Sequence, residues 1–109
     1  MQKILTYLDS HLTEEITADT LAEQFFLSKF HMMRRFRKQT GTTIHSYLTE
    51  RRLFLARDLL AQGIPSTEVC YQAGFGSYSS FSRAYGKFFG TTPKGRPGHA
   101  VRQKDETFE

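Results

Sequence analysis

The 109-residue sequence is poor in the features that define several common protein classes. It contains one cysteine, which excludes an internal disulfide framework. It has no signal peptide and no apolar run long enough to cross a bilayer, so we expect a cytoplasmic protein. Its four histidines lack the spacing of metal ligands, so the sequence predicts no metal site and no cofactor.

The residue patterns of a catalytic site are also missing. An enzyme needs titratable groups that converge in a pocket, and no such set is visible in the sequence. Ser79 and Ser80 do not stand in the context of a nucleophile elbow, and the glycines fit turns rather than a phosphate loop. Cys70 is interpreted as a small buried side chain. We therefore do not expect an enzyme.

Acidic residues are absent from two long stretches, 26–49 and 70–103. The formal net charge is only +4, which by itself indicates little. The placement of the charge is more informative, because the two acid-free stretches hold most of the basic residues, among them Lys29, Arg34, Arg35, Arg37, Lys38, Arg83 and Lys87. Segments of this kind are suited to a phosphate backbone.

One pattern occurs twice in the chain. Residues 20–43 match residues 68–92 at an offset of 48, which becomes 49 after one extra residue in the turn. Each copy has the pattern of a short helix, a tight turn and a second, basic helix that ends at a glycine, Gly41 or Gly90. This is the form of a helix-turn-helix, which lays one helix into a DNA major groove. Because stacked repeats need about three copies, two copies favour a bilobed domain.

Local signals predict the individual helices. Apolar residues at helical spacing, Ile4, Leu5, Leu8 and Leu12, indicate a first helix. Thr17 is the expected N-cap of a second helix, and Ser28 that of a third, which Gly41 ends. In the second repeat, a helix is expected to begin at Pro65 or Ser66 and another after Ser77. Core positions by helical spacing include the aromatics Phe25, Phe36, Phe75, Phe81, Tyr85 and Phe89.

These elements predict an all-α chain. We expect a first helix-turn-helix subdomain at 1–43, a linker helix at 44–62, a second subdomain at 63–97 and a disordered tail at 98–109. The apolar stripe expected on the linker helix comprises Ile44, Tyr47, Leu48, Leu55, Ala56, Leu59 and Leu60. Its arginines, Arg51, Arg52 and Arg57, are interpreted mainly as packing and ion-pair residues. Gly86 is expected to interrupt the last helix, at a cost of about 1 kcal/mol relative to Ala.

Four longer motifs extend through this framework: LS-x-x-H-M-x-R-x-F-R-x-x-x-G at 27–41, R-x-x-x-A-x-x-L-L at 52–60, I-x-x-x-x-V-C-x-x-A-G-F at 64–75 and F-S-R-x-Y-x-K-x-F-G-x-x-P at 81–93. Together they strongly resemble the DNA-binding domain of the AraC/XylS family of bacterial transcription regulators, over residues 2–94. The resemblance implies seven helices, action on promoters through RNA polymerase and, in many members, an N-terminal effector or dimerisation domain. Whether this chain is a fragment or a single-domain member stays open.

The resemblance also implies the residues that contact DNA. The first repeat would use Phe30, Met33 and Arg34 toward bases and Arg37 toward phosphate. The second repeat would use Tyr78, Ser79, Ser82 and Arg83. Secondary phosphate contacts are expected from Ser28, Lys29, His31, Lys38, Ser77 and Lys87. Met33 and Gly86 depart from the family, which often has a polar residue and a lysine there, and the segment after Pro93 lacks the usual aromatic anchor, so a seventh helix would be short or absent.

Physical chemistry leaves alternatives at several of these positions. Arg34 and Arg83 have the guanidinium fork that suits guanine O6 and N7, a contact worth about 1–3 kcal/mol of discrimination, but either could instead bind phosphate or form a local ion pair. The basic residues Lys29, Arg35, Lys38 and Lys87 could face phosphate or water. Phe30 could pack on a sugar or a thymine methyl group, or fold back into the turn, whereas Tyr78 is expected to be exposed.

The resulting hypothesis is a sequence-specific, double-stranded DNA-binding domain that reads an asymmetric bipartite site as a monomer, with two recognition helices in successive major-groove segments. Two alternatives belong to other classes. A helical protein-interaction module would bind DNA without base preference and with little salt dependence. An RNA-binding domain is disfavoured because the stacking motifs of RNA modules are missing.

Overall fold

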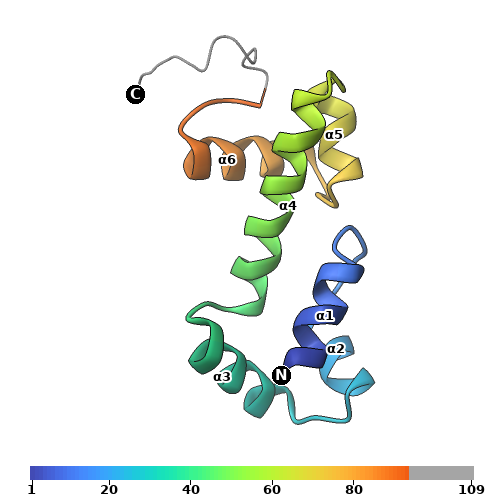
Figure 1. Cartoon of the computed structure of the whole chain (residues 1–109), viewed down its shortest axis with the longest axis vertical. Helices are drawn as coiled ribbons and strands as arrows, with labels where there is room; N and C mark the ends of the chain where they lie inside the picture. The colour runs from blue at the N-terminus through green and yellow to red at the C-terminus, as the bar shows by residue number, and fades with distance from the viewer. Residues whose placement is uncertain (94–109) are drawn as a thin grey trace. The chain divides into compact units, whose positions relative to one another are not determined.

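The computed structural model describes residues 1–93, and this part of the chain contains six helices. They are α1 (Gln2–Ser10), α2 (Ala18–Gln24), α3 (Lys29–Thr40), α4 (Ile44–Ala61), α5 (Ser66–Gln72) and α6 (Tyr78–Phe89) (Figure 1). The all-α prediction is confirmed. The expected tail at 98–109 and a seventh helix lie outside the described residues.

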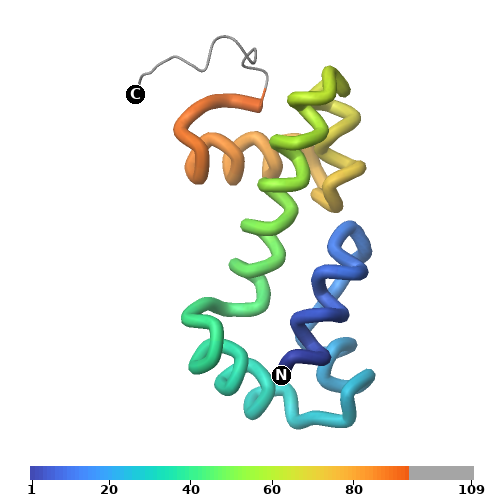
Figure 2. The backbone as a smooth tube through the Cα atoms, in the orientation of Figure 1, coloured from blue at the N-terminus to red at the C-terminus, as the bar shows by residue number. Residues whose placement is uncertain are grey.

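The chain divides into two compact units, and the boundary falls inside α4, after Arg51. The backbone trace in Figure 2 shows α4 as one continuous helix. Each unit therefore takes its own part of α4 into its core. No helix in residues 1–93 has the length and apolar character needed to span a membrane.

The first unit has a small core to which four helices contribute. Its buried residues are Ile4 and Leu8 from α1, Leu21 and Ala22 from α2, Met32 and Phe36 from α3, and Ile44 and Leu48 from α4. The four-residue spacing within α1, α3 and α4 places each pair on one helix face. On α3, Met32 and Phe36 are fully buried, and the core position predicted for Phe36 is confirmed.

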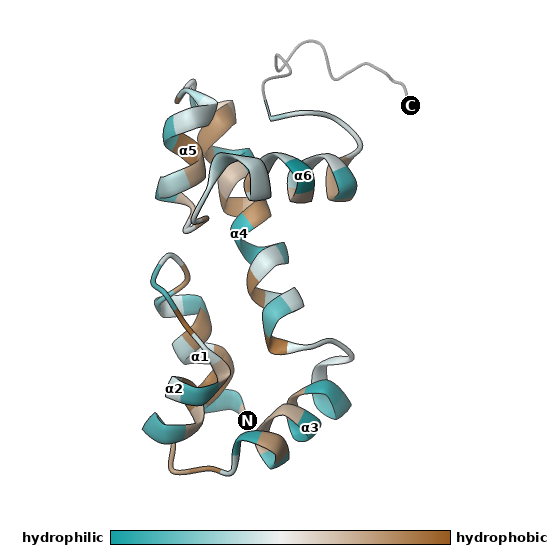
Figure 3. Ribbon diagram, turned by 180° about the vertical axis from the view of Figure 1, so that it is seen from behind, coloured by the Kyte–Doolittle hydropathy of each residue, from teal (hydrophilic) through white to brown (hydrophobic). Residues whose placement is uncertain are grey.

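The second unit repeats this arrangement with different side chains. Its core comprises Leu53 and Ala56 from α4, Val69 and Cys70 from α5, Ala73, and Phe81 and Tyr85 from α6. Phe25, Phe75 and Phe89 pack against the two cores as partly buried residues, so the aromatic core prediction is confirmed. Figure 3 shows the resulting alternation of apolar and polar residues along α3 and α6.

The stripe predicted for α4 was wrong at one position. The predicted stripe does not include Leu53, whose exposed fraction is only 2%. Leu55, which the stripe includes, is partly buried. The reason is that α4 serves two cores. The first core uses Ile44 and Leu48, and the second uses Leu53 and Ala56. The step from 48 to 53 does not follow helical spacing, so the buried face changes along the helix.

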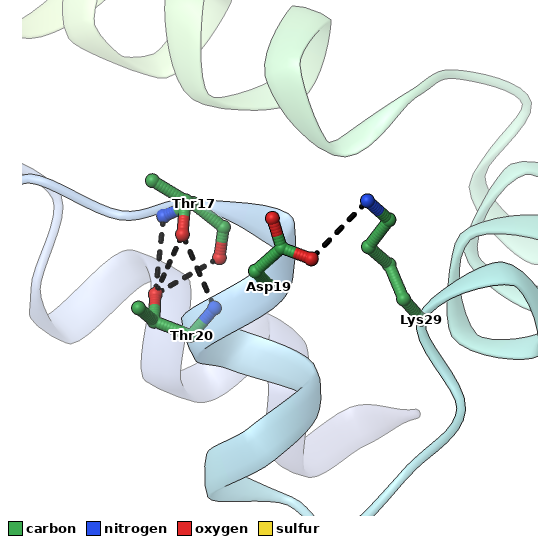
Figure 4. A network of polar contacts seen from close by, with 4 residues as sticks. All are labelled: Thr17, Asp19, Thr20 and Lys29. Atoms are coloured by element: carbon green, nitrogen blue, oxygen red, sulfur yellow. Dashed lines mark hydrogen bonds and ion pairs between the residues drawn. The ribbon is translucent and has the colours of Figure 1, made fainter.

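The helix ends follow the predicted caps. The Thr17 hydroxyl accepts a hydrogen bond from the Thr20 amide (3.1 Å), while the Thr20 hydroxyl accepts one from the Thr17 amide (3.3 Å), which closes a capping box at the start of α2 (Figure 4). Ser28 and Ser77 cap α3 and α6. Gly41 and Gly90 end these two helices in the left-handed conformation, with φ of 82° and 78°.

The turn between the two helices of each repeat contains one left-handed residue. In the second repeat this residue is Gly74 (φ 96°), and in the first it is Phe26 (φ 56°), 48 positions earlier. The flanking backbone bonds are equivalent. The amide of the next residue donates to the carbonyl four positions before the left-handed residue, Leu27 to Ala22 at 2.8 Å and Phe75 to Cys70 at 3.0 Å. Phe26 therefore holds a conformation that disfavours a side chain, and its ring is 94% exposed, so burial does not offset the strain.

Phe26→Asn is expected to stabilise the protein by about 1 kcal/mol, because asparagine tolerates the left-handed region better than phenylalanine. Denaturant unfolding followed by circular dichroism measures the change. Phe30→Asn is the matched control, because Phe30 is also exposed but lies within α3. A Phe26→Asn protein less stable than the parent would contradict the assignment of strain to this turn.

The expectation that Gly86 interrupts the last helix is wrong. α6 continues through Gly86 to Phe89, and the Gly86 carbonyl accepts the capping bond from the Gly90 amide at 2.8 Å. The helix is held at its N-terminus by Ser77 and inside by Phe81 and Tyr85, so one weak helix former does not break it.

Gly86→Ala is expected to stabilise the protein by about 1 kcal/mol through helix propensity. An added Cβ would lie 3.9 Å from the Thr91 carbonyl oxygen, an ordinary van der Waals distance. Thermal unfolding tests this result. Gly90→Ala serves as the opposite control, since its φ of 78° makes any side chain unfavourable there. Equal effects of the two changes would refute the explanation.

Candidate nucleic-acid interface

The face of α3 opposite the core carries all four residues predicted to contact DNA from the first repeat. Phe30, Met33, Arg34 and Arg37 follow the spacing that places side chains on one helix face, and all are exposed. Phe30 is 72% exposed and Met33 41%, so Phe30 does not fold back into the turn. The burial of Met32 and Phe36 turns this face outward. It offers two apolar side chains beside two guanidinium groups.

The matching face of α6 is smaller and more polar. Ser79 and Arg83 are exposed and Ser82 is half-buried. Among residues 1–93, neither Arg83 nor Arg34 forms an ion pair, so the local ion-pair alternative for these two arginines does not apply. Both guanidinium groups are therefore available to an external acceptor.

Tyr78 differs from expectation. Its side chain is half-buried rather than exposed. Its hydroxyl lies 3.2 Å from the Ser66 hydroxyl on α5, and its ring meets the Phe81 ring edge-on with 5.8 Å between centroids. The side chain thus joins α5 to α6. No local sequence pattern predicts this bond, because Ser66 is twelve residues away along the chain.

The predicted secondary contacts fall into two groups. His31, Lys38 and Lys87 are exposed side chains, and Lys38 and Lys87 lie in the last turns of α3 and α6. Ser28 and Ser77 act as N-caps, and the Ser77 hydroxyl also donates to the Ser80 hydroxyl at 3.1 Å. The hydroxyls of both cap serines are thus used inside the protein.

Lys29 forms an ion pair with a residue of α2. Its Nζ lies 3.1 Å from Oδ1 of Asp19 on α2 (Figure 4). The same Nζ lies 5.4 Å from the centroid of the Phe30 ring. The Lys29 side chain is 37% exposed and that of Asp19 78%. In the free chain the first basic group of α3 therefore already has an anionic partner, a pairing that sequence analysis missed.

Arg51 and Arg57 of α4 have an ion-pair and a packing role, respectively, as expected. Arg51 Nε lies 3.5 Å from Asp9 Oδ1, the same oxygen that accepts a 2.9 Å bond from the Tyr47 hydroxyl. Partial burial and the hydrogen bond to Asp9 raise the pKa of Tyr47. In the second unit the Arg57 guanidinium lies over the rings of Phe54 and Phe89, 5.1 and 5.2 Å from their centroids. These side chains join helices within each unit, and they do not belong to the exposed faces of α3 and α6 described above.

The single cysteine of the chain, Cys70, lies in the core of the second unit. Cys70 is fully buried, and burial raises the pKa of its thiol, which disfavours the nucleophilic thiolate. Within residues 1–93 no three histidine, cysteine or acidic side chains are grouped so that they could hold a metal ion.

Comparison with known proteins agrees with this arrangement. A family model described as a helix-turn-helix domain matches residues 21–95. Among curated proteins, the HTH-type transcriptional activator RhaS of Salmonella arizonae is 35% identical over 95 residues, which cover 86% of this chain and 34% of that protein. The chain thus spans about a third of the length of the curated relatives it matches.

Two solved structures of similar fold are DNA-binding or transcription-regulator proteins. The DNA-binding domain of AdpA, a global transcriptional factor, was crystallised in complex with a target DNA; it is 27% identical, with a TM-score of 0.80 and 84% of each chain covered. A transcriptional regulator of AraC type from Chromobacterium violaceum is 28% identical, with a TM-score of 0.75, and covers 84% of this chain and 83% of its own. By sequence and by fold, this chain belongs to the helix-turn-helix family of AraC-type DNA-binding domains.

Proposed function

We propose that this chain binds double-stranded DNA sequence-specifically as the DNA-binding domain of a bacterial transcription regulator, and that α3 and α6 enter successive major-groove segments of a bipartite promoter site. The observation that carries the proposal is the repeated helix-turn-helix, in which each second helix buries its apolar pair and exposes an acid-free face. The AdpA domain, of similar fold, has been crystallised with its target DNA. Like its family, this chain is not an enzyme.

In the first unit, specificity and affinity come from different residues of one face. Arg34 donates two hydrogen bonds to guanine O6 and N7, while Phe30 and Met33 make apolar contacts such as those with a thymine methyl group. Arg37 lies one turn further along α3 and binds phosphate, which fixes the register of the helix on the duplex. His31 and Lys38 flank this face as further phosphate contacts.

In the second unit, Arg83 has the role of Arg34, since it stands at the equivalent position of the repeat and is exposed. Ser79 and Ser82 have short hydroxyl side chains that can donate to or accept from base edges. Lys87 supplies a phosphate contact in the last turn of α6. Because Tyr78 is bonded to Ser66, we propose that it contacts DNA only with the outer edge of its ring.

The remaining partners are proposed at a coarser level. The matched residues cover only about a third of the relatives' length, so a full regulator would add an effector-binding or dimerisation domain. Its action on a promoter implies contact with RNA polymerase and a cytoplasmic location, beside the bacterial chromosome. Protein docking is the second candidate function of the domain itself. It is favoured by the exposed rings of Phe54 (36%) and Phe88 (45%), which meet edge-on in the second unit.

Selection of bound duplexes from a randomised DNA pool at near-physiological salt tests the main proposal. We expect two preferred sequence blocks centred about 10 base pairs apart, one for each recognition helix. A single block would show that only one unit specifies sequence and would overturn the bipartite part of the proposal. No enrichment by a folded protein would favour protein docking instead.

Arg83→Ala is expected to relax base preference at one position of the selected site, with a loss of about 1–3 kcal/mol of discrimination there. Arg37→Ala is the comparison variant. It should weaken binding to all duplexes nearly equally and make the slope of log K against log salt shallower by about 0.9. Binding titrations on the selected site and its single-base variants measure both. A selective loss in Arg37→Ala, or an unchanged preference in Arg83→Ala, would contradict these roles.

A further inference from the structure

We propose that Asp19 competes with DNA phosphate for Lys29 and so limits the sequence-independent DNA affinity of the first unit. The inference rests on the proposed DNA-binding function but concerns a residue outside the recognition helices. It begins with the ion pair of 3.1 Å that joins the first turn of α2 to the first residue of α3 (Figure 4).

Lys29 stands where a recognition helix meets the backbone of a duplex. It is the first residue of α3, directly before the exposed ring of Phe30, and its Nζ lies over that ring. An ammonium group at this place would bind a phosphate oxygen without regard to base sequence. In the free chain, however, that ammonium group already forms an ion pair with the Asp19 carboxylate.

The ion pair between Asp19 and Lys29 is exposed to solvent, so another anion can reach the Lys29 ammonium group. The side chain of Asp19 is 78% exposed and that of Lys29 37%, and ion pairs in such surroundings are weak because water and salt screen them. Asp19 and phosphate therefore compete for the ammonium group, and phosphate contacts Lys29 only in the complexes in which Asp19 has released it. The freed carboxylate would then stand close to the negatively charged backbone. Both effects reduce the gain from binding any duplex, whatever its sequence.

The second repeat makes the same link without charge. In the repeat alignment Lys29 corresponds to Tyr78, and Tyr78 bonds to Ser66 in the first turn of α5 at 3.2 Å. The start of each recognition helix is thus tied to the start of the preceding helix. Because a neutral bond suffices for this in the second unit, the charges of Asp19 and Lys29 are not needed to join the helices. Their charges instead affect the electrostatic potential at the exposed face of α3.

A salt titration of binding to a duplex of random sequence tests the proposal, with the parent protein, Asp19→Asn, Lys29→Gln and the double variant. Asp19→Asn is expected to bind several-fold more tightly at low salt and to steepen the slope of log K against log salt by about 0.9, because Lys29 becomes free to bind phosphate. The double variant should lose this gain. Lys29→Gln alone should change the slope by much less than it does in the Asp19→Asn background.

Two further variants separate the mechanism from simpler effects. Glu23→Gln removes one negative charge from the same helix, and Glu23 forms no ion pair within residues 1–93. It should leave the slope nearly unchanged. Asp19→Glu keeps the carboxylate and should behave like the parent protein. Thermal melting of each variant verifies that the first unit is folded.

The outcomes distinguish this inference from the function on which it rests. If the parent protein binds with a clear salt slope but Asp19→Asn equals Glu23→Gln, competition by Asp19 is overturned and DNA binding stands. If Lys29→Gln changes the salt slope equally in the parent protein and in the Asp19→Asn variant, competition by Asp19 is also overturned. If the folded parent protein binds no duplex, the proposed function fails and this inference fails with it.

Discussion

The exposed chemistry of this domain depends on the burial of one residue pair in each recognition helix. Met32 and Phe36 in α3, and Phe81 and Tyr85 in α6, stand four positions apart and enter the small cores of their units. Each pair fixes the rotation of its helix about its own axis. The opposite face of each helix must then point to solvent, which exposes Phe30, Met33, Arg34 and Arg37 on α3 and, separately, Ser79 and Arg83 on α6.

The two repeats show which features of the helix-turn-helix are strict and which are free to vary. The left-handed residue of the turn is strict, because Phe26 adopts it despite a strained backbone where the second copy has Gly74. The bond that ties the recognition helix to its predecessor is also present twice, but its chemistry differs. An ion pair serves in the first unit and two hydroxyl groups serve in the second. The left-handed turn residue and the bond between the two helices are therefore repeated in position, whereas the side chains that provide them differ.

The proposed competition between Asp19 and phosphate would make the affinity for DNA moderate rather than maximal. The recognition helices carry no acidic residue, yet Asp19 lies beside the first lysine of α3. A purely basic surface would bind every duplex, since phosphate contacts are independent of sequence. In our proposal, a carboxylate next to such a surface lowers the sequence-independent part of the affinity, while the guanidinium groups of Arg34 and Arg83 stay available for base edges. The net charge of only +4 fits this interpretation.

The sequence by itself determined the helices, their caps, the buried pairs and the outward face of α3, because these follow from local spacing and from the residues at helix ends. The repeat and its motifs determined the family. Tertiary structure alone decided the partners of side chains that are distant in the sequence: Asp19 with Lys29, Ser66 with Tyr78, and Asp9 with Tyr47 and Arg51. It also decided that α4 turns a different face, with Leu53, toward the second core. Such pairings depend on how helices pack across a turn, and neither helical spacing nor residue preference specifies that packing.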